Sequence, residues 1–179
     1  MKINIGSGDT CLDGFINCDS STIFNPEYVF NLETDIFPFE DNSVDEVMAS
    51  HVLEHLGEGY FHCLKELYRV CANGAIIHVR APHYRNECQY FDPTHRRPIT
   101  EYGFVLFNKK HNLADSTASS KLGLVYDVDF QVISCTHSLY ERHPLYDSLR
   151  KMTPEQLQRF EFDKFNIYSE TRIDLKVIK

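Results

Sequence analysis

The sequence lacks the features that would place the chain in or across a membrane. Its 179 residues include no tryptophan and no run that approaches the roughly 18 to 20 apolar residues of a membrane-spanning helix. Residues 1–4 lead directly into a strand-like segment, without the layout of a signal peptide. We therefore expect a soluble, cytoplasmic protein with no membrane partner.

Little in the sequence supports a metal or disulfide framework. The six cysteines form no Cys-x-x-Cys pair and have no short regular spacing. We expect free thiols in a reducing compartment and no metal site.

Basic residues are also scarce. The chain has 18 Lys and Arg against 26 Asp and Glu, which gives a net charge of −8. Nucleic-acid affinity comes mainly from Lys and Arg that neutralise phosphates. The sequence therefore disfavours a nucleic-acid partner, and any anionic ligand must meet a local basic patch.

The residues that are present suit a folded domain. Hydrophobic residues make up 42% and aromatic residues 13% of the chain, enough to fill one core at this length and to exclude disorder. No internal repeat, low-complexity tract or linker interrupts the sequence. We predict a single domain over residues 1–179.

Short apolar runs alternate with one long helical pattern. From Val52 to Val70 apolar residues recur every three or four positions, and Gly57 and Gly59 are expected to divide this helix. Thr153 is expected to cap a helix that reaches residue 160. The order predicts an α/β fold with a largely parallel sheet, whose strands we expect at 2–5, 15–19, 28–30, 44–50, 75–79, 128–135 and 169–178.

Residues 83–122 are expected to form an irregular insertion. They are rich in Pro, His, Arg, Asn and Ser and are too long for an ordinary connection. Insertions of this kind are typically lids or substrate loops, with surface decoration as the alternative.

Two features at the first strands indicate an adenosine-type ligand. Gly6-Ser7-Gly8 directly follows a strand, where the absence of Cβ atoms lets a ligand approach the backbone, although a tight turn explains it equally well. Asp19 ends the next strand, where an acid can accept hydrogen bonds from both ribose hydroxyls. Only residues 6–14 join these strands, too few for the usual crossover helix, and the triple-glycine fingerprint is absent. NAD and FAD are therefore disfavoured relative to an adenosine ligand without phosphate.

A set of motifs between residues 1 and 130 carries a family resemblance. The most specific is FPFEDNSVDEVMASHVLEH at 37–55. The others are KINIGSG at 2–8, GFINCD at 14–19, LYRV at 67–70, NG at 73–74, PH at 82–83 and DPTHRRPIT at 92–100. Together these motifs resemble the small class I S-adenosylmethionine-dependent methyltransferases.

The resemblance implies a Rossmann-like class I methyltransferase fold, with a mostly parallel seven-stranded sheet, an antiparallel last strand and, in this chain, a shortened first crossover. It implies S-adenosylmethionine as the cofactor. Asp19 would bind the ribose, and Asn31 stands near the adenine where relatives tend to have an acid, so that a charge is lost there. The implied cofactor-binding residues are Gly6, Ser7, Gly8, Asp19, Asn31, Leu32, Ser50 and His51.

His51-Val52-Leu53-Glu54-His55 also matches the His-x-x-Glu-His signature of zinc peptidases. In that interpretation the two histidines bind zinc and the glutamate activates water. The predicted strand ends at His51 and the helix begins only afterwards, so the histidines are not expected to share a helical face. A zinc hydrolase is therefore a minor alternative.

The segment after the 75–79 strand carries the candidate catalytic residues. Methyl transfer needs an aligned nucleophile, and a base if that nucleophile carries a proton. His83 or His95 could be the base, with Asp92 orienting it; a capped turn at 92–95 and a His/Asp metal site are the alternatives. The residues expected to contact an anionic acceptor are Tyr84, Arg85, Arg96 and Arg97, although a solvated loop explains the charges equally well.

The sequence thus predicts methyl transfer from S-adenosylmethionine to a small or carbohydrate-like, anionic acceptor, with oxygen as the favoured atom. The alternative of another class is a non-catalytic S-adenosylmethionine-binding module in a larger complex. A homodimer is compatible with the sequence.

Overall fold

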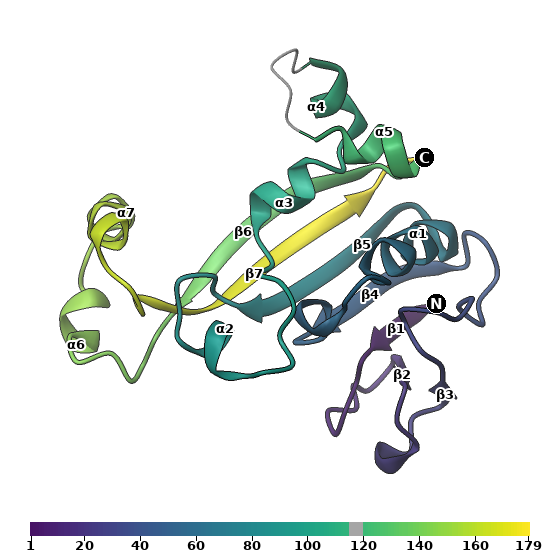
Figure 1. The fold of residues 1–179 in the computed structure, drawn as a ribbon, viewed down its shortest axis with the longest axis horizontal. Coiled ribbons are helices and arrows are strands. Elements are labelled where there is room, and N and C mark those ends of the chain that lie inside the picture. The colour runs from purple at the N-terminus through teal and green to yellow at the C-terminus, as the bar shows by residue number, and fades with distance from the viewer. Residues whose placement is uncertain (115–119) are drawn as a thin grey trace.

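A computed structural model describes residues 1–114 and 120–179, and its centre is one seven-stranded sheet (Figure 1). The strand order is β3-β2-β1-β4-β5-β7-β6. Strands β1 to β5 pair in parallel, and β7 pairs antiparallel with both β5 and β6. The predicted sheet is therefore confirmed, with the bounds β1 Lys2–Ile5, β2 Ile16–Asp19, β3 Tyr28–Val29, β4 Val44–Ser50, β5 Cys71–Pro82, β6 Phe130–Leu139 and β7 Tyr168–Val177.

The predicted division of the first long helix is confirmed. A 3-10 turn, η2 (Leu53–His55), is separated from α1 (Tyr60–Val70). Glu33 explains the break, since one carboxylate oxygen accepts hydrogen bonds from the backbone N–H of both Gly57 and Gly59, each at 3.0 Å. A Cβ on Gly59 would lie 2.3 Å from the Cβ of Glu33, so this close approach requires glycine.

The first crossover contains no helix, as its length predicts. Two buried amides hold this loop in place of helix packing. The side-chain oxygen of Asn17 accepts hydrogen bonds from the Asn4 amide and the Leu12 N–H, both at 2.9 Å. The only short helix before β3 is the 3-10 turn η1 (Thr22–Phe24).

One face of the sheet is buried and the other is polar. Along β4 and β5, Val47, Ala49, Ile77 and Val79 are buried in a core shared with α1. The alternate positions, such as His78, are partly exposed. This two-residue period follows from the pleat of the strands.

The insertion at 83–122 contains short helices, which corrects the prediction of an irregular segment. Its residues 115–119 lie outside the described part of the chain. It contains the short helices α2 (Cys88–Phe91), α3 (Glu101–Val105), α4 (Lys109–Ala114) and the start of α5 (Leu122–Tyr126). Ile99, Phe104 and Phe107 are buried in the main core. Helices of four to six residues show too few turns for a readable apolar period.

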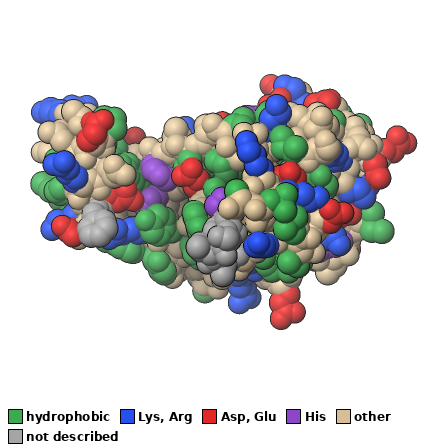
Figure 2. Space-filling model, turned by 90° about the horizontal axis from the view of Figure 1, so that it is seen from above, with side chains coloured by type: hydrophobic (Ala, Val, Ile, Leu, Met, Phe, Trp, Pro, Cys, Tyr) green, Lys and Arg blue, Asp and Glu red, His purple; other side chains and the backbone are tan. Residues whose placement is uncertain are grey.

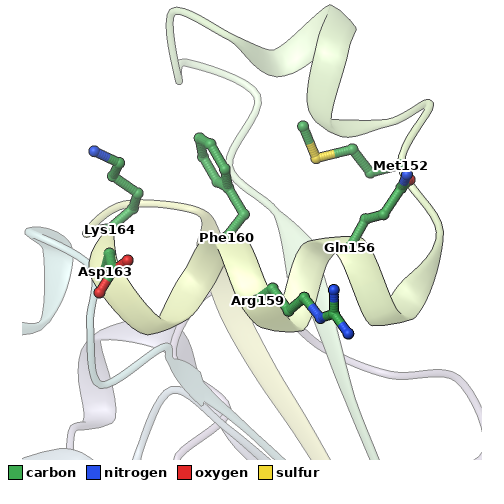
Figure 3. A pocket seen from close by; sticks show the side chains of 6 residues that line it. All are labelled: Met152, Gln156, Arg159, Phe160, Asp163 and Lys164. Carbon is green, nitrogen blue, oxygen red and sulfur yellow. The ribbon is translucent and has the colours of Figure 1, made fainter.

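Strands β6 and β7 extend to a lobe at the far left of Figure 1, made of α6 (Tyr146–Leu149) and α7 (Pro154–Asp163). The expected cap of α7 is present as a capping box between Thr153 and Gln156. The hollow in Figure 3 belongs to this lobe and has a volume of about 390 Å³; it is lined by Met152, Gln156, Arg159, Phe160, Asp163 and Lys164. Among the described residues, no helix combines the length and apolar character needed to cross a membrane.

Candidate functional site

The site lies where the parallel strands β1, β2 and β4 end. Parallel strands bring their carboxyl ends to one edge of the sheet, where open α/β folds bind ligands. Gly6, Asp19 and His51 stand at or just beyond these ends. The helix-free first crossover leaves this edge bounded by loops.

Asp19 is positioned by backbone donors. Its Oδ2 accepts a hydrogen bond from the Gly8 N–H at 2.9 Å, and its Oδ1 accepts one from the Ser21 N–H at 2.8 Å. A carboxylate oxygen has a second lone pair, so each retains an acceptor site for a ligand hydroxyl. The side chain is partly exposed.

Gly6 is required by both conformation and packing. Its φ of +60° lies in the left-handed region that disfavours residues with a Cβ. A Cβ at this position would also lie 2.2 Å from Cγ2 and 2.6 Å from Cβ of Val52. The loop after β1 and the turn after β4 therefore touch at Gly6.

Two cavities, of about 380 Å³ and 320 Å³, share Gly6 and His51. Asp19, Asn31 and Leu32 line the first. The second is lined by polar and small groups that include Ser7, Gly8, Ser50 and Arg80. All eight residues predicted to bind the cofactor thus line one or both of these cavities.

His51 links this edge of the sheet to β7. Its Nε2 lies 3.1 Å from Oε2 of Glu170, and its Nδ1 lies 3.4 Å from Oε1 of Glu54. Hydrogen bonding to Glu170 and then to Glu54 raises the pKa of His51 to about 9. The same contact with His51 lowers the pKa of Glu170 to about 2. At neutral pH the two side chains are therefore an imidazolium and a carboxylate.

Glu170 opens onto a third cavity, of about 630 Å³. Its polar lining includes two arginines, Arg142 and Arg172, and Tyr140 from the β6–α6 connection. No local pattern in the sequence predicts this cavity, because its residues come from distant parts of the chain: Cys88, Phe91, Ser138, Leu139, Tyr140, Glu141, Arg142, Ser169, Glu170 and Arg172.

The predicted catalytic residue His83 is buried, with 1% of its surface exposed. Its ring packs against those of Tyr84, His137 and Tyr168, and its Nε2 lies 3.3 Å from Oε1 of Glu161. Burial, with smaller contributions from His137 and Arg85, lowers the pKa of His83 to about 4. His83 is therefore neutral at physiological pH and lies outside the lining of the three cavities.

This burial predicts an acid-sensitive stability. Because His83 has an ordinary pKa of 6.5 when unfolded and about 4 when folded, the unfolded chain binds the proton first. Stability is expected to fall as the pH drops from 6.5 to 4, by up to about 3 kcal/mol from this residue. Urea unfolding over this range should show a steeper loss for the wild type than for His83→Asn. If the free energy of unfolding fell equally steeply with pH in both proteins, the assignment of this loss to His83 would be refuted.

The 92–97 segment is folded on itself and on the turn after β4. Asp92 Oδ1 accepts hydrogen bonds from the N–H of Thr94 at 2.8 Å and from its hydroxyl at 2.6 Å. These bonds form the capped turn that the sequence offered as the alternative to a catalytic role. These bonds lower the pKa of Asp92. Arg97 donates to the carbonyls of Leu56 and Gly57, while Arg96 is exposed.

The structure therefore separates the predicted catalytic and acceptor residues from the cavities. His95 is only partly exposed and does not line them, nor do Asp92, Tyr84, Arg85, Arg96 and Arg97. Their predicted roles have no support from cavity geometry and stay predictions. On the face in Figure 2, cationic and anionic side chains are interspersed, with no large patch of one sign.

Comparisons with known proteins agree with this architecture. Residues 17–79 match the family model described as a methyltransferase domain. No curated protein matches the sequence.

The solved structures that resemble this one share its fold at low sequence identity. A SAM-dependent methyltransferase from Archaeoglobus fulgidus is 15% identical, with a TM-score of 0.61 over 98% of this chain and 85% of that one. A chain of the Haloferax volcanii complex between the Trm112 methyltransferase activator and a methyltransferase is 10% identical, with a TM-score of 0.60 over 99% and 82%. The YcgJ protein of Bacillus subtilis is 12% identical, with a TM-score of 0.56 over 99% and 91%.

Proposed function

This chain is a class I S-adenosylmethionine-dependent methyltransferase, and on that premise we propose that it methylates an oxygen of a small, carbohydrate-like, anionic acceptor. The observation that carries the proposal is the position of His51. It lines both cavities around Gly6, and its partner Glu170 lines the larger cavity beside them. His51 thus marks the junction between a cofactor site and an acceptor site.

The residues around Gly6 fit the cofactor. Asp19 offers acceptor oxygens for ribose hydroxyls, and the Asn31 side chain offers an amide for an adenine edge. On the other side of Gly6, Ser7 Oγ is buried and has no hydrogen-bond partner among the described residues. Arg80 lies on the same cavity and could pair with the carboxylate of the methionine portion. The first cavity would then hold the adenosine and the second the amino-acid end.

The third cavity supports an anionic, hydroxyl-rich acceptor. Arg142 and Arg172 can bind carboxylate or phosphate oxygens, and Tyr140 and Ser138 can hydrogen-bond sugar hydroxyls. A cavity of about 630 Å³ is within the usual range for a small-molecule site. Two acids, Glu141 and Glu170, line the same cavity, and Glu170 pairs with Arg172, so the proposal of an anionic acceptor rests mainly on Arg142.

The protein's part in catalysis is mainly to align the acceptor. When bound, S-adenosylmethionine supplies the electrophilic methyl group. The His51–Glu170 pair would fix the acceptor oxygen at the junction, where proximity and orientation lower the barrier. A base role for His83 or His95, with Asp92 as its orienting group, stays a prediction, as do the cytoplasmic location and the homodimer.

Arg142 provides the test of the acceptor site. Losing one charge-assisted hydrogen bond costs about 1.5 to 3 kcal/mol, so Arg142→Gln should raise KM for an anionic acceptor about 10- to 100-fold. Methyl transfer from a radiolabelled donor to sugar phosphates, nucleotide sugars and sugar acids would first identify the acceptor. The affinity for S-adenosylhomocysteine should not change.

Arg150→Gln is the matched control, because Arg150 is exposed, pairs with Asp147 and lies outside the cavity. An Arg142→Gln enzyme with unchanged KM would place the acceptor elsewhere. Binding of S-adenosylhomocysteine without transfer to any acceptor would favour the second candidate, a cofactor-binding module of a complex. The similarity to a chain of a methyltransferase–activator complex keeps that candidate open.

A further inference from the structure

The turn after β4 and the loop after α2 bring together three metal-ligand side chains, Glu54, His55 and His95. One ligand atom of each lies within 4.8 Å of the others. Coordination at about 2.0 to 2.1 Å with tetrahedral angles separates ligand atoms by roughly 3.4 Å. Small side-chain movements would therefore close the three groups around one ion.

Glu54 is the observation that points to a cation. Its side chain is fully buried, at 0% exposure; Oε1 is paired with His51 alone, and Oε2 has no partner among the described residues. The nearest charged group is His51, whose Nδ1 lies 3.4 Å from Oε1 and whose Nε2 is already engaged by Glu170. A buried carboxylate is costly when one of its oxygens has no partner, and a bound ion would supply a partner for Oε2.

Each imidazole uses Nδ1 for a hydrogen bond, and His95 Nε2 lies 3.8 Å from Oδ2 of Asp92. His55 Nδ1 lies 2.8 Å from the hydroxyl oxygen of Thr94, and that hydroxyl donates its own hydrogen to Asp92. The Thr94 oxygen must therefore accept from His55. His95 Nδ1 lies 3.1 Å from the backbone carbonyl of Gln89, which can only accept. In both neutral rings Nδ1 is then the donor and the lone pair is left on Nε2, the arrangement found where a metal-binding histidine donates its other N–H to an acceptor.

The backbone holds the two ligand-bearing segments together. The N–H groups of Arg96 and Arg97 donate to the carbonyl of Glu54 at 2.7 Å and 3.3 Å. The guanidinium of Arg97 adds a bond to the Leu56 carbonyl at 3.1 Å. His95 is therefore fixed beside Glu54 and His55 by contacts that do not involve the ligand atoms.

We propose that Glu54, His55 and His95 bind a divalent transition-metal ion of the zinc type. Two imidazoles and one carboxylate suit Zn²⁺, whereas Mg²⁺ and Ca²⁺ prefer sets made of oxygen. The site differs from the peptidase pattern, because Glu54 is a ligand here and His51 is not. His55 also lines the cavity of about 380 Å³, so the ion would lie at the wall of the proposed cofactor site, with a fourth position open to water or a ligand.

Metal titration of the full chain tests the proposal. After treatment with a chelator, calorimetry with ZnCl₂ should give a single site per chain, and Co²⁺ should give the visible spectrum of a site with nitrogen ligands. Glu54→Gln and His95→Gln should each weaken zinc binding by more than about 100-fold. Removing a residue that only orients a metal ligand already costs about 10- to 100-fold in affinity. Mg²⁺ should not compete at equal concentration.

Glu58→Gln and His143→Gln are the matched controls, since Glu58 is exposed and neither residue belongs to the cluster; both should bind zinc as the wild type does. Should Glu54→Gln fail to fold by circular dichroism, His95→Gln decides the result. Absence of a stoichiometric site, or wild-type affinity in a folded Glu54→Gln or His95→Gln, would overturn the proposal. Binding of S-adenosylhomocysteine by the zinc-free chain separates this outcome from a failure of the proposed function.

Discussion

Asp19→Ala is expected to weaken binding of S-adenosylhomocysteine about 100-fold or more, because two charge-assisted hydrogen bonds to the ribose would be lost at about 1.5 to 3 kcal/mol each. The carboxylate is held in place by the N–H groups of Gly8 and Ser21 at 2.9 Å and 2.8 Å. Little rearrangement is therefore needed when the ligand binds. Isothermal titration calorimetry on the purified chain measures the change directly.

Two further variants make this result specific. Asp19→Asn keeps one acceptor oxygen without the charge, so its affinity should lie between those of the wild type and Asp19→Ala. Asp13→Ala removes an exposed acid from the same crossover and should bind as the wild type does. Thermal melts show whether Asp19→Ala stays folded, and a folded variant with unchanged affinity would refute the assignment of Asp19 to the ribose.

Gly6→Ala is expected to destabilise the fold by about 2 to 5 kcal/mol. A residue with a Cβ costs roughly 1 to 2 kcal/mol in the left-handed region, and overpacking adds about 1 to 3 kcal/mol. The β-branched Val52 cannot swing away, because its own Cβ would lie 2.6 Å from the added methyl group. For a chain of this size the expected fall in Tm is about 4 to 20 °C.

Gly8→Ala separates the two causes. Gly8 has a φ of +51°, but a Cβ there would meet no atom within 4 Å. Only the conformational cost of about 1 to 2 kcal/mol should then apply. Urea unfolding of both variants gives the comparison, and equal losses would show that the contact between Gly6 and Val52 carries no energy.

The parts of the fold that the sequence predicts well are those whose signals are local. The bounds of β1 and β4 were predicted to the residue, because each is a short apolar run that ends in turn or polar residues. The cap of α7 was predicted for the same reason, since Thr153 is directly followed by Pro154, which suits the first helical position. The short helices α2 to α5 carry no such period and were missed.

The candidate cofactor site was predictable for a related reason. In a parallel sheet every strand brings its carboxyl end to the same edge, so Gly6, Asp19 and Ser50 meet simply because each stands at the end of a strand. The strand positions alone indicated Gly6 and Asp19, whereas Asn31, Leu32, Ser50 and His51 were implied by the family resemblance. All eight predicted cofactor residues line the two cavities at that edge.

The predicted catalytic and acceptor residues were also chosen for their position after a strand end, but they do not line the three cavities. His83 follows β5 at this edge, yet its ring turns into a cluster with His137 and Tyr168 and is buried. Arg97 was predicted to bind an anionic acceptor, but its guanidinium donates hydrogen bonds to the carbonyls of Leu56 and Gly57. The direction of a side chain depends on what packs around it, which a strand end does not specify.

The sequence by itself determined the positions of the strands along the chain, the helix-free first crossover and the glycine and acid at the ends of β1 and β2, since each follows from neighbours within a few residues. Only the tertiary structure decided the partners of His51 and the cluster of Glu54, His55 and His95. Glu170 is 119 positions from His51, and His95 is 41 positions from Glu54. The physical reason is that these contacts depend on how β7 and the loop after α2 pack against the turn that follows β4, and no local pattern encodes that packing.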